Sequence, residues 1–115
     1  MNYGYSKNLP KHKNAKKWKK QRKKRGFDDT ELVSLNTSLA RHIYPRLLQF
    51  RDFTKSHPME LTAQQWEEIL DKMIFSFKII GDDEYYDIPY DNAKAWDRIQ
   101  CGFDLFGKYY QHLWS

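Results

Sequence analysis

The chain has 115 residues, which is enough for one compact domain and hardly enough for two. It is 40% hydrophobic, 17% aromatic and 30% charged, a composition typical of a soluble protein with ample material for a core. Its single cysteine, Cys101, excludes an intrachain disulfide framework and a cysteine-rich zinc site. No segment approaches the roughly 18 apolar residues of a membrane span. The basic N-terminus also lacks the apolar stretch of a secretory signal peptide, so we expect no membrane partner.

The net charge of +5 conceals two blocks of opposite sign. Residues 1–26 contain eleven lysines and arginines and no acidic residue. Residues 27–115 contain the other 9 basic residues and all 15 acidic ones, a net charge of −6. Charge blocks of this kind are typical of a solvated tail that meets a polyanion. We therefore divide the chain into a basic N-terminal arm, residues 1–26, and an acidic, aromatic-rich helical domain, residues 27–115.

The arm has few apolar side chains and many like charges, so the sequence predicts that it is disordered or extended. Its cations can neutralise phosphates, and Trp18 among them can stack on an unpaired base. The predicted contacts to nucleic acid, a ribonucleoprotein or another polyanion are Lys13, Lys16, Lys17, Trp18, Lys19, Lys20, Arg22, Lys23, Lys24 and Arg25. Two other interpretations stay open: a solubilising tail, and a clamp onto the acidic domain of the same or a second subunit.

The domain begins with a predicted short helix over about 31–35, for which Asp28, Asp29 or Thr30 is the expected N-cap. A longer helix capped by Asn36 or Thr37 follows. Its apolar residues recur at helical spacing and predict one buried stripe, formed by Leu39, Ile43, Leu47 and Phe50. Pro45 lies inside this helix, where a proline removes a backbone donor and predicts a kink or a restart.

The clearest helix signal lies in residues 62–80. Thr62 and Gln65 have the spacing of a capping box, and Gly81 is expected to follow the last turn. The apolar stripe between them consists of Trp66, Ile69, Leu70, Met73, Ile74, Phe77 and Ile80. Residues 82–90 are predicted to form a loop that Pro89 interrupts.

A last helix is predicted after a cap at Asp91 or Asn92. Its apolar residues follow a heptad-like spacing and are Trp96, Ile99, Phe103, Phe106, Tyr110 and Leu113. Gly102 and Gly107 each cost about 1 kcal/mol within a helix, so they either permit close helix contact or mark a break. The elements together predict an all-α fold of three to four helices in a small antiparallel bundle.

A second candidate site combines Arg41 and Arg46 with Tyr85 and Tyr86. Arginine forks suit phosphate or carboxylate groups, so these residues are predicted contacts for an anionic ligand or a partner. The alternative for the two arginines is a solvated surface.

The acidic residues Asp82, Asp83, Glu84 and Asp87 lack the spacing of a calcium loop, so we expect no metal there. They form either a solvated loop or a docking site for a basic surface. No sequence motif for catalysis is present, and we expect neither an enzyme nor a cofactor.

Four stretches resemble a family of small proteins encoded by tailed bacteriophages. They are residues 25–29 (RGFDD), 44–47 (YPRL), 69–75 (ILDKMIF) and 103–110 (FDLFGKYY). The resemblance covers roughly residues 25–115. It implies an accessory or host-manipulating protein in the cytoplasm of the infected bacterial host, and it implies no particular activity.

Three functions are therefore compatible with the sequence. The leading one is a non-enzymatic phage accessory protein whose arm docks on nucleic acid or another polyanion. The alternative is a counter-defence or host-takeover protein whose body sequesters a nucleotide signal or inhibits a host protein, and the third is a virion structural component. Because the domain is small and very aromatic, we also expect part of its surface to be buried in a homodimer or higher oligomer.

Overall fold

The computed structural model describes residues 11–115, and this part of the chain is all-α, as predicted, with no strand. Its helices are α1 (Ala15–Arg25), α2 (Thr30–Val33), α3 (Leu35–Phe53), α4 (Ala63–Gly81) and α5 (Ala93–Tyr109), with short 3-10 turns η2 (Glu84–Asp87) and η3 (Tyr110–His112). Within these residues no helix is both long and apolar enough to cross a bilayer.

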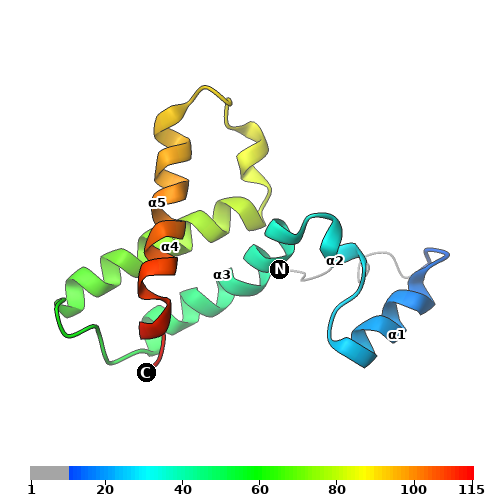
Figure 1. Cartoon of the computed structure of the whole chain (residues 1–115), viewed down its shortest axis with the longest axis horizontal. Coiled ribbons are helices and arrows are strands. Elements are labelled where there is room, and N and C mark those ends of the chain that lie inside the picture. The colour runs from blue at the N-terminus through cyan, green and yellow to red at the C-terminus, as the bar shows by residue number, and fades with distance from the viewer. Residues whose placement is uncertain (1–10) are drawn as a thin grey trace.

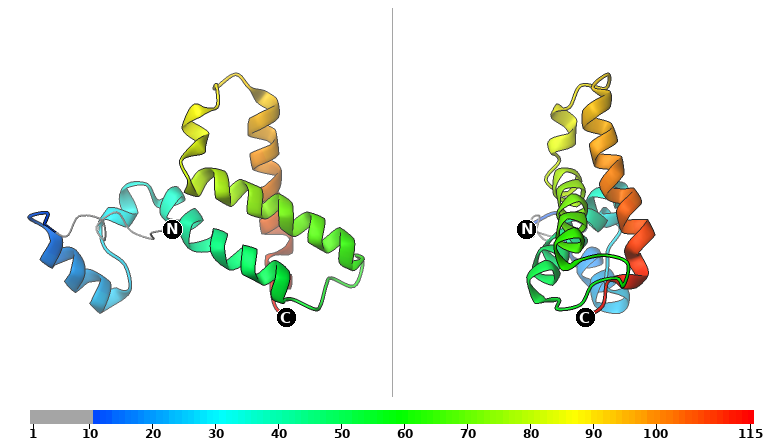
Figure 2. Two further views of the ribbon diagram at one scale, coloured as in Figure 1. Left: turned by 180° about the vertical axis from the view of Figure 1, so that it is seen from behind. Right: turned by 90° about the vertical axis from the view of Figure 1, so that its left-hand side faces the viewer.

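Helices α3 and α4 form an antiparallel hairpin, and α5 crosses α4 at a steep angle (Figures 1 and 2). Helix α1 lies apart from these three, beyond the short α2. The arrangement therefore differs from a simple antiparallel bundle, because only α3 and α4 lie alongside each other.

Helix α4 is the centre of the fold, because it packs against both α3 and α5. The predicted capping box is confirmed: the Thr62 hydroxyl accepts from the Gln65 backbone N–H, and the Gln65 side chain accepts from the Thr62 backbone N–H. The buried residues of its stripe are Trp66, Leu70, Met73, Ile74, Phe77 and Ile80. Edge-to-face aromatic contacts then join α4 to α5, with the Phe77 ring 4.8 Å from the Phe106 ring and 5.1 Å from the Phe103 ring.

The crossing of α4 and α5 depends on a glycine. A Cβ atom on Gly102 would lie only 2.4 Å from the Lys72 carbonyl oxygen and 1.9 Å from the Ser76 Oγ. The fully buried Ser76 hydroxyl donates to the Ile99 carbonyl across this contact, at 2.7 Å. Of the two roles that the sequence left open for Gly102, the structure therefore shows close helix contact.

Helix α3 runs without a break through Pro45, so of the predicted kink or restart no restart occurs there. The helix departs from its prediction in two ways. Its N-cap is Ser34 rather than Asn36 or Thr37. The side chain of Leu39, predicted to lie in the buried stripe, is 49% exposed, whereas Ala40 and Leu47 are buried. Helix α4 packs on the face of α3 that carries Ala40. The neighbouring face, which carries Leu39, therefore remains exposed.

The last helix begins as predicted, since the Asn92 side chain accepts from the Ala95 backbone N–H. Its end differs, because Tyr109 rather than Tyr110 is buried. Tyr109 packs edge-to-face on Trp66, at 5.6 Å between ring centroids, and Tyr110 remains 62% exposed. The close crossing at Gly102 sets this rotation of α5, which places Tyr109 two turns further along the same face.

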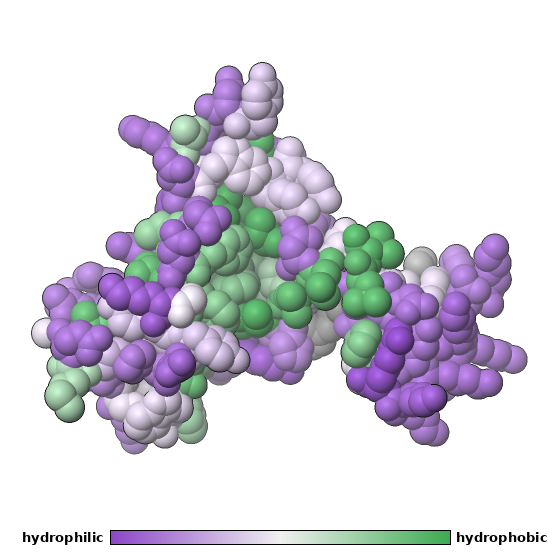
Figure 3. All heavy atoms as spheres, in the orientation of Figure 1, coloured by the Kyte–Doolittle hydropathy of each residue, from purple (hydrophilic) through white to green (hydrophobic). Residues whose placement is uncertain are grey.

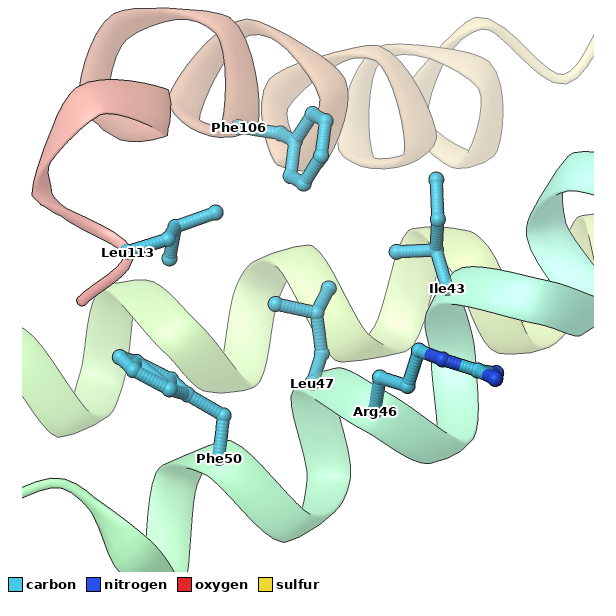
Figure 4. A pocket seen from close by; sticks show the side chains of 6 residues that line it. All are labelled: Ile43, Arg46, Leu47, Phe50, Phe106 and Leu113. Carbon is cyan, nitrogen blue, oxygen red and sulfur yellow. The ribbon is translucent and has the colours of Figure 1, made fainter. Parts of the chain in front are cut away.

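An apolar groove separates α3 from α5, because both helices pack on α4 (Figure 4). It has a volume of about 240 Å³ and is lined by Ile43, Arg46, Leu47, Phe50, Phe106 and Leu113. This groove leaves the core open on one side. The chain is also extended, with a radius of gyration of 16.6 Å against about 13 Å for a compact domain of this length, because α1 lies apart from the other helices (Figure 1).

Candidate nucleic-acid interface

Residues 15–25 of the basic arm form the helix α1, which corrects the prediction of a disordered or extended segment. Gly26 ends the helix in the left-handed conformation, φ 87°, and its N–H donates to the Arg22 carbonyl. An isolated helix of this length is marginal in water, and its lysines at i and i+4 repel one another. Contacts with the following segment must therefore stabilise α1. Residues 1–10, the remainder of the predicted arm, lie outside the described residues.

The first of these contacts is made by Asp28, which is completely buried. Its carboxylate accepts from the Arg22 guanidinium at 2.7 Å. The same carboxylate accepts from the Thr30 backbone N–H, and the Glu31 carboxylate accepts from the Asp28 backbone N–H. The N-cap of α2 is Asp29, one of the three caps that the sequence predicts, and it makes no side-chain capping bond. Asp28 instead accepts from the first residue of α2 and ties α2 to α1.

Asp29 provides the second contact. The Gln21 side-chain amide donates to its carboxylate at 2.8 Å and accepts from its backbone N–H at 2.9 Å. The Arg25 guanidinium donates to the same carboxylate at 2.7 Å, and the Lys17 ammonium lies 3.8 Å away. The hydrogen bonds from Gln21 and Arg25 lower the pKa of the Asp29 carboxyl below its ordinary 3.8. We call Asp28 and Asp29 together the acidic anchor of α1.

Trp18 lies on the anchored side of α1 and is only 8% exposed. Its ring stacks on the His12 imidazole with 4.6 Å between centroids. In this conformation the ring is covered, so the stacking of Trp18 on an unpaired base stays a prediction and requires exposure of the ring. Burial of the ring supplies apolar contact to a helix that otherwise carries almost only polar side chains.

The opposite side of α1 consists of exposed lysines. At about 100° per residue, they fall within an arc of roughly 140° on the helix surface. They are Lys16, Lys19, Lys20, Lys23 and Lys24, and we call them the lysine face. None of the ion pairs found in residues 11–115 involves any of them. Of the other predicted contacts, Lys13 is exposed before the helix, whereas Lys17, Arg22 and Arg25 face the acidic anchor.

Sequence reasoning treated Asp28 and Asp29 only as helix caps and did not assign Gln21 a role. A signal for the anchor was nevertheless present. Lys17, Gln21 and Arg25 recur every four residues and share one face of a helix. A glycine turn then brings the first two acidic residues of the chain back towards that face.

The second candidate site is not assembled as a single anion pocket. The Arg41 guanidinium donates to the Gly81 carbonyl at 2.7 Å and to the Asp83 carboxylate at 2.9 Å, so it holds the end of α4. The Arg46 guanidinium donates instead to the His42 carbonyl of its own helix. The two arginines are thus directed to different partners, although both belong to α3.

The tyrosines of that site lie in η2, next to Asp83 in the sequence. The rings of Tyr85 and Tyr86 stack on each other with 4.3 Å between centroids. Tyr85 packs partly against the core, and Tyr86 is 69% exposed. They therefore form a small exposed aromatic surface at one end of the body.

Three of the four carboxylates of the acidic loop, those of Asp82, Asp83 and Glu84, form ion pairs with neighbouring cations. The Lys78 ammonium lies 3.3 Å from the Asp82 carboxylate and 3.0 Å from the Glu84 carboxylate. Hydrogen bonds to these two groups raise the Lys78 pKa above its ordinary 10.5. Among residues 11–115, no cluster of three or more acidic, histidine or cysteine side chains is arranged to hold a metal ion.

No protein-family model, curated protein or solved structure matches this chain. The similarity to small tailed-phage proteins therefore stays a prediction.

Proposed function

We propose that this chain is a non-enzymatic protein that binds the phosphate backbone of duplex DNA through the lysine face of α1. The observation that carries the proposal is the two-sided character of this helix. One side is fixed to the acidic anchor, and the other presents five lysines that have no ion-pair partner within residues 11–115. An ordered row of cations neutralises phosphates and releases their counterions, which gives affinity without sequence preference.

The chemistry of α1 favours a duplex over a single strand. Single-strand binding depends on aromatic side chains that stack on bases, and Trp18 is buried. Arginine side chains can read base edges through forked hydrogen bonds. Arg22 and Arg25 instead bind the acidic anchor. The lysine face is thus suited to backbone contacts.

The dimensions of α1 favour DNA over RNA. A helix with its side chains is about 10–12 Å across, which matches the roughly 12 Å major groove of B-form DNA. The major groove of A-form RNA is deep and narrow and does not admit a helix. Helix α1 also lies clear of the α3–α5 body, so a duplex meets little steric hindrance there (Figure 1).

In the context that the sequence resemblance implies, this activity belongs to a phage accessory protein in the cytoplasm of an infected bacterium. The acidic body then repels nucleic acid and leaves α1 as the docking element, since residues 27–115 carry a net charge of −6. A counter-defence role as the sink for a small anionic signal has less support, because Asp83 occupies the Arg41 guanidinium.

A binding assay with a matched control tests the proposal. The variant Lys19→Gln, Lys20→Gln, Lys23→Gln removes three charges from the lysine face and keeps helix-forming side chains. The control variant Lys55→Gln, Lys72→Gln, Lys94→Gln removes three exposed charges from the body. Fluorescence anisotropy with a labelled DNA duplex measures the affinity of each.

We expect the lysine-face variant to bind about 10- to 100-fold more weakly than the parent near 0.1 M salt, because three phosphate contacts are lost. The control should bind within about twofold of the parent. Equal affinities of the lysine-face variant and the parent contradict the proposal. Tighter binding of single-stranded than of duplex DNA contradicts the choice of a duplex.

A further inference from the structure

A continuous apolar surface extends from the α3–α5 groove along α3 to α2. Figure 3 shows it as a hydrophobic zone that runs from the centre of the body towards α2. We call it the apolar band, and its exposed or groove-lining residues are Leu32, Leu35, Leu39, Ile43, Phe50 and Phe106. Leu32, Leu35 and Leu39 are 47–50% exposed. Side chains of this kind are usually buried, so the band marks a contact surface.

Two hollows lie along this band. The first is the groove between α3 and α5, of about 240 Å³. The second, of about 320 Å³, lies where residues 26–27 and α2 meet the start of α3, and Leu32, Leu35 and Leu39 line it. Ser38 also lines this hollow, and its buried hydroxyl has no hydrogen-bond partner in the described part of the chain. The band therefore carries both protruding leucines and cavities that accept such side chains.

We propose that the apolar band is the interface of a two-fold symmetric homodimer, in which the exposed leucines of α2 and α3 of each copy enter the α3–α5 groove of the other. A two-fold interface pairs the same patch on both subunits, so it must contain both the protruding and the receiving elements. The apolar band satisfies this requirement along a single helix, with Leu35 and Leu39 on one side of Ile43 and the groove on the other.

The charges beside the band fit the same symmetry. Glu31 lines the hollow at the α2 end, and Arg46 lines the groove. When two copies pair with their α3 helices antiparallel, the end of the band that carries Glu31 lies towards the end of the other copy's band that carries Arg46. Complementary charges at opposite ends of a self-pairing surface specify this antiparallel orientation.

The size of the band fits a weak, reversible dimer. Residues 35–50 of α3 span roughly 23 Å at the helical rise, and the part of α5 that lines the groove widens the band to roughly 20 Å at the usual helix spacing. The resulting footprint of roughly 460 Å² lies below the roughly 800 Å² that each partner buries in an interface of standard size, so we expect an affinity in the micromolar range. Addition of a second copy also covers the groove between α3 and α5.

Sedimentation equilibrium tests the proposal directly. The full chain is freed of nucleic acid by nuclease and measured at about 0.5 M salt, where electrostatic bridging is screened. Over about 1–100 µM, a range that brackets micromolar affinity, we expect a concentration-dependent approach to twice the chain mass of 14.0 kDa. A mass of one chain at every concentration overturns the proposal and leaves the band to a different partner.

Substitutions locate the contact. Leu39→Lys places two charges in a symmetric interface, one from each copy, and should raise the dissociation constant roughly 100-fold or more. Met59→Lys, at a residue that is 98% exposed outside the band, should leave the dimer unchanged. Far-UV circular dichroism shows whether each variant is folded. A folded Leu39→Lys variant that dimerises like the parent overturns the assignment of the interface.

The dimer and the proposed DNA binding fail independently. The variant with three glutamines on α1 retains the apolar band, so it should dimerise like the parent. A DNA-binding monomer therefore contradicts the dimer alone, and a dimer that does not bind DNA contradicts the proposed function alone.

Discussion

Substitution of Gly102 by alanine tests the most constrained contact in the fold. The new Cβ would lie 2.4 Å from the Lys72 carbonyl oxygen, which belongs to the backbone of α4 and cannot rotate away. It would also lie 1.9 Å from the Ser76 hydroxyl oxygen. Helix α5 must therefore move away from α4 by roughly 1 Å to restore ordinary contact distances.

Three terms determine the change in the free energy of unfolding. Overpacking of a close helix contact costs about 1–3 kcal/mol. Weakening of the hydrogen bond from Ser76 to the Ile99 carbonyl costs about 1 kcal/mol more. The higher helix propensity of alanine returns about 1 kcal/mol. We expect Gly102→Ala to lower the free energy of unfolding by about 2 kcal/mol, or the Tm by roughly 8–16 °C.

Gly107→Ala is the matched control, because it is the same substitution five residues further along α5. A Cβ on Gly107 meets no atom within 4 Å. Only the propensity gain remains, so we expect the Tm to rise by a few degrees, for about 0.5–1 kcal/mol of stabilisation. Thermal unfolding followed by far-UV circular dichroism measures both. Shifts of the same sign in the two variants would refute the close crossing at Gly102.

Three further predictions concern the polar contacts. Asp28→Asn removes the buried partner of Arg22, and we expect about 2–3 kcal/mol less protection of α1 against hydrogen exchange, with α4 unaffected. Equal protection of α1 in variant and parent would contradict the anchor. The lowered pKa of Asp29 means that its contribution to α1 docking is fully present above pH 3.8 and disappears as the pH falls through the lower value. An NMR titration of its carboxyl should therefore have a midpoint below 3.8, and a midpoint at or above 3.8 contradicts the hydrogen bonds from Gln21. Arg41→Gln should leave DNA affinity unchanged and lower the Tm, because Arg41 holds the end of α4; a selective loss of DNA binding would contradict that structural role.

Local signals in the sequence were sufficient to predict α4 and the start of α5. The capping box at Thr62 and the cap at Asn92 are contacts between residues three apart, so spacing alone determines them. Helix α4 packs against both α3 and α5, so most of the apolar residues that repeat along it at helical spacing are buried in the core. These elements depend little on how the helices are arranged.

The predictions of order and burial failed where they depend on a segment that is distant in the sequence or that follows the residue in question. The charge repulsion within α1 predicts disorder, and the acidic anchor that follows Gly26 overcomes it together with the burial of Trp18. The exposure of Leu39 and the burial of Tyr109 depend on how α3 and α5 rotate against α4. The rotation of α5 is set by the contact of Gly102 with α4, and that of α3 by the packing of its Ala40 face on α4; no periodicity in the sequence reveals either contact.

The salt dependence of DNA binding measures how many phosphates the lysine face contacts. Counterion release gives a slope of about −0.9 per phosphate contact in a plot of log affinity against log salt, or about −4.5 for the five residues of the lysine face. We expect a slope near this value for the parent and for the body control. The variant that lacks Lys19, Lys20 and Lys23 should have a slope that is smaller in magnitude by about 2.7. An identical slope for parent and variant would contradict the assignment of the lysine face as the surface that meets DNA.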